Sequence, residues 1–180
     1  MRIENIPTGK NPPWDVNIII EIPLGGPSIK YEFEKESGAL WVDRVLHTAM
    51  YYPCNYGFVP HTLAEDGDAV DALVAAHEPV VPGCVYRARP IGVLEMEDEA
   101  GIDQKVICVP VNALSPYYRN VNSVADLPSI LVEQIKHFFG HYKDLEPNKW
   151  VKVGDFSDAQ RGADVIARGI ETYNKSKQAR

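Results

Sequence analysis

The hydrophobic period of the chain changes once, and this change limits the folds open to it. Up to about residue 111, apolar residues alternate with polar ones or form short runs bounded by Gly and Pro, as in β-strands. Beyond residue 128 they recur with the spacing of one face of an α-helix. This order predicts several short strands followed by two helices, which favours a β-barrel with helices packed outside it.

The first expected strand covers residues 14–22, where Val16, Ile18 and Ile20 share one face. Residues 1–13 are expected to have little regular structure, and residues 175–180 are expected to be frayed. One helix is expected over 128–143, and a second over 157–174, where Ser157 and Gln160 have the spacing of a capping box. The remaining expected strands cover residues 29–35, 39–46, 70–76, 85–96 and 105–111, with a buried loop and short strand over 50–62, an acidic hairpin tip over 97–104 and a loop over 112–127.

Length and charge narrow the classes of function. A chain of 180 residues fits one domain, and we expect a single domain over 1–180. The formal net charge of −7 argues against non-specific binding to nucleic acid or to an anionic membrane, both of which need a basic surface. The 3 cysteines form no Cys-x-x-Cys motif, and the N-terminal residues contain no apolar signal segment. The expected location is the cytoplasm.

An acidic stretch at residues 65–71 has four carboxylates around Gly67. Like charges at this spacing repel one another, and a bound cation would relieve the repulsion. Carboxylate oxygens are hard ligands that suit Mg²⁺, Mn²⁺ or Ca²⁺. An EF-hand is excluded, because positions six and twelve counted from Asp66 are Asp71 and His77 rather than Gly and Glu. Asp-Gly is also a common hairpin turn, so a solvated acidic turn remains the alternative.

Other charged residues also allow two interpretations, one structural and one functional. The face of strand 29–35 that carries Lys30 and Glu32 is either solvated or part of a site. The acidic hairpin tip, with Asp98 and Asp103, needs a partner site if it is to have a function. His137 and His141 lie one helical turn apart, a spacing that could bind metal but that favours packing or a subunit contact here.

Several motifs in chain order resemble those of one family. The acidic motif runs from Asp66 to Asp71, and a Tyr-Pro-Cys-Asn-Tyr-Gly motif covers residues 52–57. The other matching pieces are Lys30 with Glu32, Arg44, residues 98–105 and residues 141–145. Together they resemble the soluble family I inorganic pyrophosphatases in their short bacterial form. One departure is Ala69, which stands where the family has proline, and it would loosen the loop without removing a ligand.

The resemblance implies a fold and an activity. The implied fold is mainly β, a five-stranded closed barrel of the oligonucleotide-binding (OB) type with two main flanking helices. The implied reaction is Mg²⁺-dependent hydrolysis of pyrophosphate to two phosphates, by in-line attack of a metal-activated water, with several Mg²⁺ ions in each active site. The resemblance also implies a cytoplasmic homo-oligomer, commonly a hexamer.

The resemblance also assigns roles to individual residues. Asp68 is the expected general base. Glu21 and Glu32 are expected to act on metal through water. The expected metal ligands are Asp66, Asp71, Asp98 and Asp103, with Asp71 as the bridge. The expected substrate-binding residues are Lys30, Arg44, Tyr56, Lys105, Tyr142 and Lys143.

Two alternatives come from other functional classes. A non-enzymatic OB-type binding protein would need a basic groove with stacking aromatics, which the net charge of −7 disfavours. A metal-dependent phosphohydrolase that acts on an organic phosphate is the second alternative, although the chain contains no Walker-type glycine-rich loop.

Overall fold

Five strands form a closed ring of hydrogen-bonded pairs in the computed structural model, which describes residues 2–34 and 36–178. Around the ring, each strand pairs with the next and the last pairs with the first. Among the described strand pairs, only β6–β9 is parallel. The expected mainly β, OB-like fold with two helices is confirmed. In ring order the strands are β2 (Asp15–Ile22), β5 (Asn55–Phe58), β6 (Asp71–Val74), β9 (Lys105–Pro110) and β7 (Val85–Asp98).

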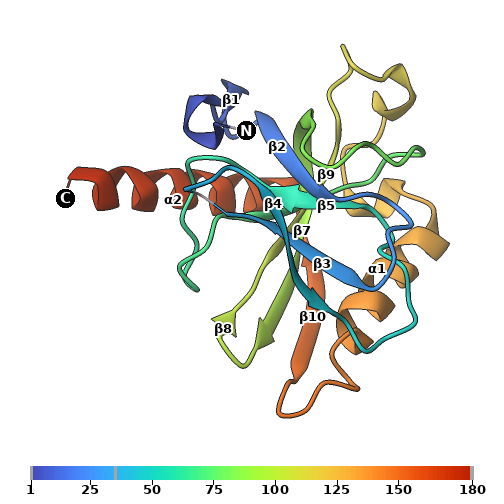
Figure 1. Ribbon diagram of the computed structural model, residues 1–180. Helices are drawn as coiled ribbons and strands as arrows, with labels where there is room; N and C mark the ends of the chain where they lie inside the picture. The colour runs from blue at the N-terminus through green and yellow to red at the C-terminus, as the bar shows by residue number, and fades with distance from the viewer. Residues whose placement is uncertain (1, 35, 179–180) are drawn as a thin grey trace.

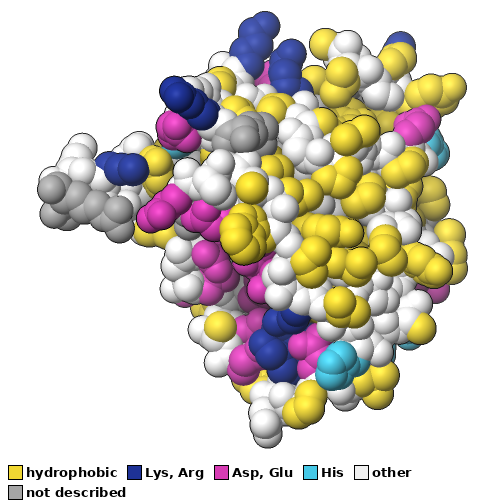
Figure 2. Space-filling model, viewed as in Figure 1, with side chains coloured by type: hydrophobic (Ala, Val, Ile, Leu, Met, Phe, Trp, Pro, Cys, Tyr) yellow, Lys and Arg dark blue, Asp and Glu magenta, His cyan; other side chains and the backbone are white. Residues whose placement is uncertain are grey.

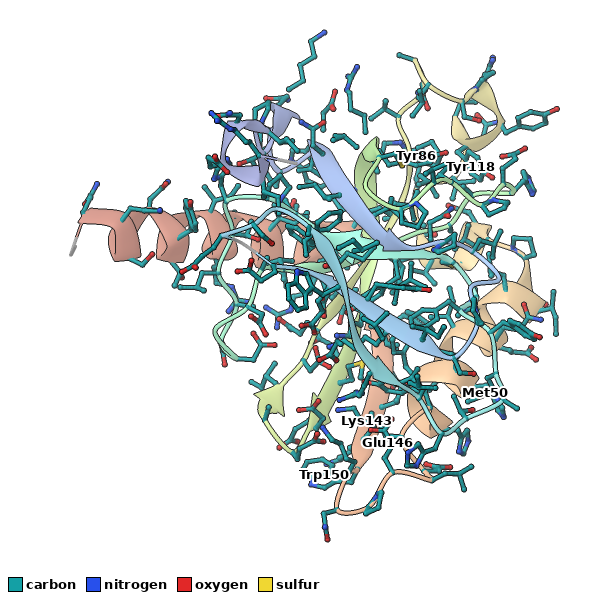
Figure 3. The ribbon with its side chains drawn as sticks, in the orientation of Figure 1. Met50, Tyr86, Tyr118, Lys143, Glu146 and Trp150 are labelled. Atoms are coloured by element: carbon teal, nitrogen blue, oxygen red, sulfur yellow. The ribbon has the colours of Figure 1, made fainter. Side chains whose placement is uncertain are left out.

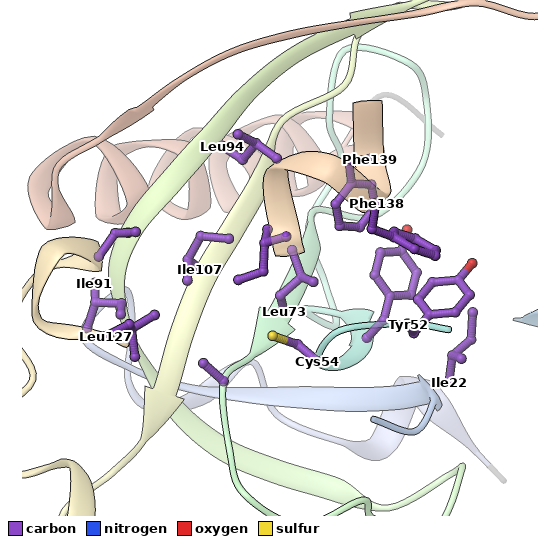
Figure 4. Packing of buried hydrophobic residues seen from close by; sticks show 14 of the residues in the cluster. Ile22, Tyr52, Cys54, Leu73, Ile91, Leu94, Ile107, Leu127, Phe138 and Phe139 are labelled. Atoms are coloured by element: carbon purple, nitrogen blue, oxygen red, sulfur yellow. The ribbon is translucent and has the colours of Figure 1, made fainter. Parts of the chain in front are cut away.

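Each helix covers one of two hydrophobic clusters (Figure 1). In β2, every residue after Asp15 is buried, because both faces of this strand meet apolar side chains. One cluster includes Leu73 and Ile107 and is covered by α1 (Ser129–His141) through Phe138 and Phe139 (Figure 4). The other cluster is covered by α2 (Ala159–Gln178), and Figure 1 shows the last turns of α2 projecting beyond the strands.

Strands β3 (Ile29–Phe33) and β4 (Leu40–Val45) form a separate antiparallel pair. In Figure 1 this hairpin crosses in front of the ring. Its register places Lys30 opposite Arg44, so two cations predicted to bind substrate lie next to each other on one hairpin. Residue 35, the expected end of this strand, lies outside the described residues.

The second helix begins and ends differently from the prediction. Ser157 is not its cap, because Ser157 closes a strand and donates a hydrogen bond to Glu95 Oε1 at 3.1 Å. The cap is Asp158, whose Oδ1 accepts a hydrogen bond from the backbone N–H of Arg161 at 2.8 Å. The helix continues to Gln178, so the prediction of fraying was wrong for residues 175–178. Residues 179–180 lie outside the described part of the chain.

Several elements were not predicted from the sequence. The strand β10 (Val151–Ser157) pairs with β7, and β1 (Gly9–Asn11) pairs with β2. The two-residue strand β8 (Gly101–Ile102) folds back on the end of β7. Short 3₁₀ turns occur at η1 (Ile3–Asn5), η2 (Pro116–Tyr118) and η3 (Val124–Asp126). None of the described helices is both long enough and apolar enough to cross a lipid bilayer.

Candidate active site

The acidic stretch is a tight turn closed by its own backbone. The N–H of Ala64 donates to the carbonyl of Asp68 at 2.7 Å, and the N–H of Asp68 donates to Asp66 Oδ1 at 3.0 Å. Gly67 has a φ of 93°, a conformation that glycine adopts without steric cost. The turn presents the carboxylates of Asp66 and Asp68 at its exposed tip and leads directly into β6 at Asp71.

The turn rests on α2. The backbone N–H of Leu63 donates to the carbonyl of Gly169 at 2.9 Å. Thr62 Oγ1 donates to the carbonyl of Val59 and accepts from the N–H of Val70, at 2.6 and 2.8 Å. A side chain at position 169 would come within 2.6 Å of Val70. The last helix, to which the sequence motifs assign no role, therefore packs directly against the base of the acidic turn.

The parallel β6–β9 pair brings together the centre of the site. Asp71 begins β6 and Lys105 begins β9, so the two side chains lie at the same edge of the ring. The buried Lys105 ammonium donates hydrogen bonds to Asp71 and to Asp103, and it lies 5.7 Å from the centre of the Tyr56 ring. Although burial opposes it, the carboxylates of Asp71 and Asp103 raise the pKa of Lys105. Lys105 is therefore a firmly charged cation between two acids.

The carboxylates of the site are crowded. Burial raises the pKa of Asp103 despite the neighbouring Lys105. Asp66 is exposed, but partial desolvation still raises its pKa, and the nearby acids raise it further. Burial raises the pKa of Glu21 to about 8, although its Oε1 accepts a hydrogen bond from the N–H of Phe33 at 2.8 Å. Burial and the neighbouring acids both disfavour the charged forms of these carboxyls, and their hard oxygens fit a divalent cation such as Mg²⁺.

The described residues form no metal cage before metal binds. In the part of the chain that the structure describes, no three His, Cys, Asp or Glu side chains are already grouped as metal ligands. Instead, Asp71 and Asp103 both form ion pairs with the ammonium of Lys105. A small cavity of about 110 Å³ lies between the acidic turn and α2, and Asp66, Asp71, Asp103 and Arg168 are among the residues that line it. The sequence analysis did not single out Arg168.

A second group of charges surrounds Lys143, which is labelled in Figure 3. Lys143, which is buried, donates hydrogen bonds to Asp98 Oδ2 at 2.6 Å and to Glu99 Oε2 at 3.3 Å. Lys149 pairs with Glu99 at 2.9 Å. These contacts join the tip of the β7–β8 hairpin to the loop that follows α1.

The substrate-binding cations on the β3–β4 hairpin also have acidic partners. Lys30 Nζ contacts the carboxylate of Glu32 and lies 3.6 Å from Asp43 Oδ2. Arg44 Nε lies 3.6 Å from Glu146 Oε2. Asp43 and Glu146 were not predicted, although each adjoins a matching piece of the sequence, because neither belongs to the motifs themselves. Figure 2 shows the result as acidic side chains with Lys and Arg among them, beside a broad hydrophobic area.

Three buried tyrosines complete the wall of the site. Burial raises the pKa values of Tyr52, Tyr56 and Tyr142, so all three phenols keep their protons. The Tyr142 ring stacks on Phe138, with ring centres 5.5 Å apart. Tyr142 also interacts electrostatically with Lys105, which connects the loop after α1 to the centre of the site. Tyr52 belongs to a motif noted in the sequence but was given no role there.

The predicted site residues therefore fall into one region. Lys105 holds Asp71 and Asp103 together, and Asp103 interacts electrostatically with Asp98, the partner of Lys143. Glu21 interacts in the same way with Asp71, Glu32 and Lys30. Asp66 interacts with Asp68, Asp71 and Asp103. Arg44 lies opposite Lys30 in the β3–β4 register and also contacts Glu146, which was not predicted.

A sequence model of one family, described as inorganic pyrophosphatase, matches residues 18–174. The chain belongs to the inorganic pyrophosphatase family. The resemblance drawn from the motifs is thereby confirmed.

Individual relatives agree with this assignment. The chain is 57% identical over 176 residues to an inorganic pyrophosphatase of Caulobacter vibrioides, with 98% of this chain and 99% of the relative covered. It is 59% identical over 170 residues to the Rhodospirillum rubrum inorganic pyrophosphatase, with 94% and 95% covered. Among solved structures, the inorganic pyrophosphatase of Thermus thermophilus has a TM-score of 0.90 at 39% identity, with 97% of this chain and 99% of that chain covered.

Proposed function

We propose that this member of the inorganic pyrophosphatase family hydrolyses pyrophosphate to two phosphates by in-line attack of water, with Asp68 as general base and Mg²⁺ as cofactor. The observation that carries the proposal is the alternation of acids and cations around Asp71, Lys105 and Asp103. A purely acidic site would repel a polyanion, and a purely basic site would hold no divalent metal. A site with both kinds of charge suits a substrate that binds together with metal ions.

The acids would hold the cofactor. Asp66, Asp71, Asp98 and Asp103 offer hard oxygens, and their crowding is the imbalance that divalent ions would relieve. Glu21 and Glu32 would act through water, since Mg²⁺ keeps several water ligands. When bound, Mg²⁺ would neutralise substrate charge and lower the pKa of a coordinated water.

The cations and phenols would hold the substrate. An ammonium has three N–H donors, and Lys105 uses two of them on Asp71 and Asp103, which leaves one for a phosphate oxygen. Lys30, Lys143 and Arg44 would bind further phosphate oxygens. Tyr56 and Tyr142 keep their protons, so each can donate to the same oxygens.

Asp68 is suited to accept a proton. It is exposed at the tip of the acidic turn, and within the described residues its carboxylate accepts no hydrogen bond. A carboxylate without a partner is free to orient towards water and to take its proton. General bases contribute about 10²–10⁴-fold to rate.

The test compares two similar variants. Asp68→Asn should lower turnover by about 10²-fold or more with little loss of Mg²⁺ affinity, because it removes only the base. Asp71→Asn should weaken Mg²⁺ binding, because it removes a ligand. Phosphate release from pyrophosphate and Mg²⁺ titration give the two readouts, with Asp155→Asn on the exposed surface as the control. If instead Asp68→Asn weakened Mg²⁺ binding and Asp71→Asn lowered only turnover, the roles of base and ligand would be exchanged. Undiminished turnover in excess chelator would refute the metal dependence.

Parallel assays separate the alternatives. Faster phosphate release from a nucleoside triphosphate than from pyrophosphate would favour an organic phosphate as substrate. Salt-dependent binding of single-stranded nucleic acid without hydrolysis would favour the non-enzymatic binding protein.

We also propose a homo-oligomer, with a hexamer as the expected state and the cytoplasm as the expected location. A cleft of about 610 Å³ lies between α1 and the loop before β5, lined by residues that include Tyr51, Ile130 and His137. Tyr51 in the loop is 66% exposed and Ile130 on α1 is 60% exposed, so both sides of the cleft expose an apolar side chain. The His137 and His141 rings lie 4.7 Å apart on α1. These features support α1 as part of a contact between copies.

A further inference from the structure

Glu146 is a buried carboxylate in the loop after α1, and both of its sequence neighbours, Leu145 and Pro147, are exposed. Its side chain is 7% exposed, although it lies only five residues beyond the end of α1. Glu146 Oε1 is buried without a hydrogen-bond partner in the described part of the chain. Burying a charged carboxylate is costly unless a cation lies beside it. The cation beside Glu146 therefore indicates the role of this residue.

That partner is Arg44. Its Nε lies 3.6 Å from Glu146 Oε2 and is itself buried without a hydrogen bond to any described residue. The Glu146 side chain and the Arg44 Nε atom are buried, while the Arg44 side chain as a whole is 27% exposed, so the pair joins the protein interior to the side chain that reaches the site. The separation is longer than a hydrogen bond, so a movement of a few tenths of an ångström would close it.

The surroundings show what this pair holds in place. The β3–β4 hairpin has no strand pairing with the ring among the described residues, so side-chain contacts fix its position. His47 Nδ1 lies 3.1 Å from the carbonyl of Leu145, next to Glu146. Figure 3 shows Glu146 close to Lys143 in the same loop, and the N–H of Glu146 donates to the carbonyl of Lys143 at 2.9 Å. One short loop therefore carries both Lys143 and the residue that faces Arg44.

We propose that Glu146 is a positioning residue that aligns the Arg44 guanidinium for pyrophosphate by engaging its Nε, so that both terminal nitrogens stay free for a phosphate group. The proposal rests on the proposed role of Arg44 in substrate binding. Within residues 2–34 and 36–178, neither terminal nitrogen of Arg44 has a hydrogen bond. Guanidinium is planar and rigid, so fixing Nε also fixes the direction of the other two nitrogens.

This division of donors explains why the position holds arginine. A lysine ammonium is one point of charge on a flexible stem and cannot be held at one nitrogen while it binds with others. Glu146 can orient the guanidinium of an arginine through Nε, while the two terminal nitrogens donate two parallel hydrogen bonds to phosphate. The loop after α1 would then set two substrate contacts together, Lys143 directly and Arg44 through Glu146.

The experiment is a double-mutant cycle on the full-length protein. The variants are Glu146→Met, which removes the acceptor at similar length, Glu146→Gln, which keeps one, Arg44→Lys, and the combination of Glu146→Met with Arg44→Lys. For each we would measure kcat and KM for pyrophosphate with Mg²⁺. We would also measure the binding of non-hydrolysable imidodiphosphate by titration calorimetry. The control is Asp15→Asn, which breaks the Arg87 ion pair between β2 and β7, outside the site.

The expected result is a rise in KM of about tenfold for Glu146→Met, the factor that about 1.4 kcal/mol of binding free energy represents, with kcat within twofold of the native value. Glu146→Gln should recover most of the loss. In the Arg44→Lys background, Glu146→Met should change KM by less than about twofold, because the oriented group is already gone. Asp15→Asn should leave KM unchanged.

Three results would overturn the inference. The first is a rise in KM on Glu146→Met that is equally large in the native protein and in the Arg44→Lys background. The second is a loss in kcat with KM unchanged. The third is an Arg44→Lys protein that hydrolyses and binds like the native protein. A native protein that binds imidodiphosphate but releases no phosphate would refute the proposed reaction instead, and the calorimetric cycle would still decide the role of Glu146.

Discussion

The contact between α2 and the acidic turn predicts opposite effects for two similar substitutions, Gly169→Ala and Gly140→Ala. Both glycines lie inside helices, where alanine is favoured over glycine by about 1 kcal/mol. At position 140 the new Cβ would meet Val153 Cγ2 at 3.8 Å, an ordinary contact. At position 169 it would meet Val70 Cγ2 at 2.6 Å and Thr62 Cβ at 3.1 Å, so the turn or the helix must move.

The magnitude follows from these distances. Overpacking of this kind costs about 1–3 kcal/mol. Gly140→Ala should therefore raise the free energy of unfolding by up to about 1 kcal/mol. Gly169→Ala should lower it by about 0–2 kcal/mol, after the gain in helix propensity is subtracted. Gly140 is next to the last residue of α1, so its propensity gain is no larger than that of Gly169 in the middle of α2, and the difference between the two variants gives a lower limit on the cost of overpacking.

Urea denaturation in chelator measures the two stabilities, and Mg²⁺ titration measures the function of the turn. Because Val70 immediately precedes Asp71, we expect Gly169→Ala to weaken Mg²⁺ binding and Gly140→Ala to leave it unchanged. Equal stabilisation of both variants would refute the packing argument. A destabilised Gly169→Ala protein with native Mg²⁺ affinity would show that α2 does not position the acidic turn.

Other predictions concern charge. Lys105→Met should destabilise the metal-free protein by about 3–5 kcal/mol, since it leaves buried carboxylates unpaired, and calorimetry should show that Mg²⁺ restores part of this loss. Although burial opposes it, hydrogen bonds led by Arg161 lower the pKa of Glu95 below its ordinary value of 4.5. Glu95→Gln should therefore cost about 0.5–1 kcal/mol above pH 4.5, and denaturation from pH 7 to 3 should show this cost disappearing as acid protonates Glu95. If His137 and His141 lie at a contact between copies, the mass from light scattering should fall between about pH 7.5 and 5.5. Replacing both histidines with Gln should remove this response, and a mass that ignores pH would refute the contact.

The strands that were predicted from the sequence are those with an unbroken pattern. In β2, Val16, Ile18, Ile20 and Ile22 recur at every second position, and burial is continuous after Asp15 because ring neighbours and helices bury both faces. The strand β10 was missed because its alternation is interrupted, with Gly154 and Asp155 between Val153 and Phe156. The structure explains the interruption, since the β10–β7 register shifts between Val153 and Phe156.

Contacts between segments far apart in the chain could not be predicted from the sequence. Ser157 and Asp158 are both good caps, and Glu95, far away in the chain, engages Ser157 and leaves Asp158 to cap α2. Likewise, nothing near Glu146 in the sequence indicates burial, which depends on the β3–β4 hairpin folding over its loop. The roles of the individual site residues and the single domain over 1–180 remain predictions.

The parallel pairing of β6 with β9 has a consequence for folding kinetics. Asp71 and Lys105 are 34 positions apart in the chain and meet only when these two strands come together. Pairing of β7 with β9 closes a short loop between antiparallel strands. Pairing of β6 with β9 closes a longer loop and therefore costs more loop-closure entropy. Recovery of turnover during refolding therefore reports completion of the whole ring rather than the formation of its separate hairpins.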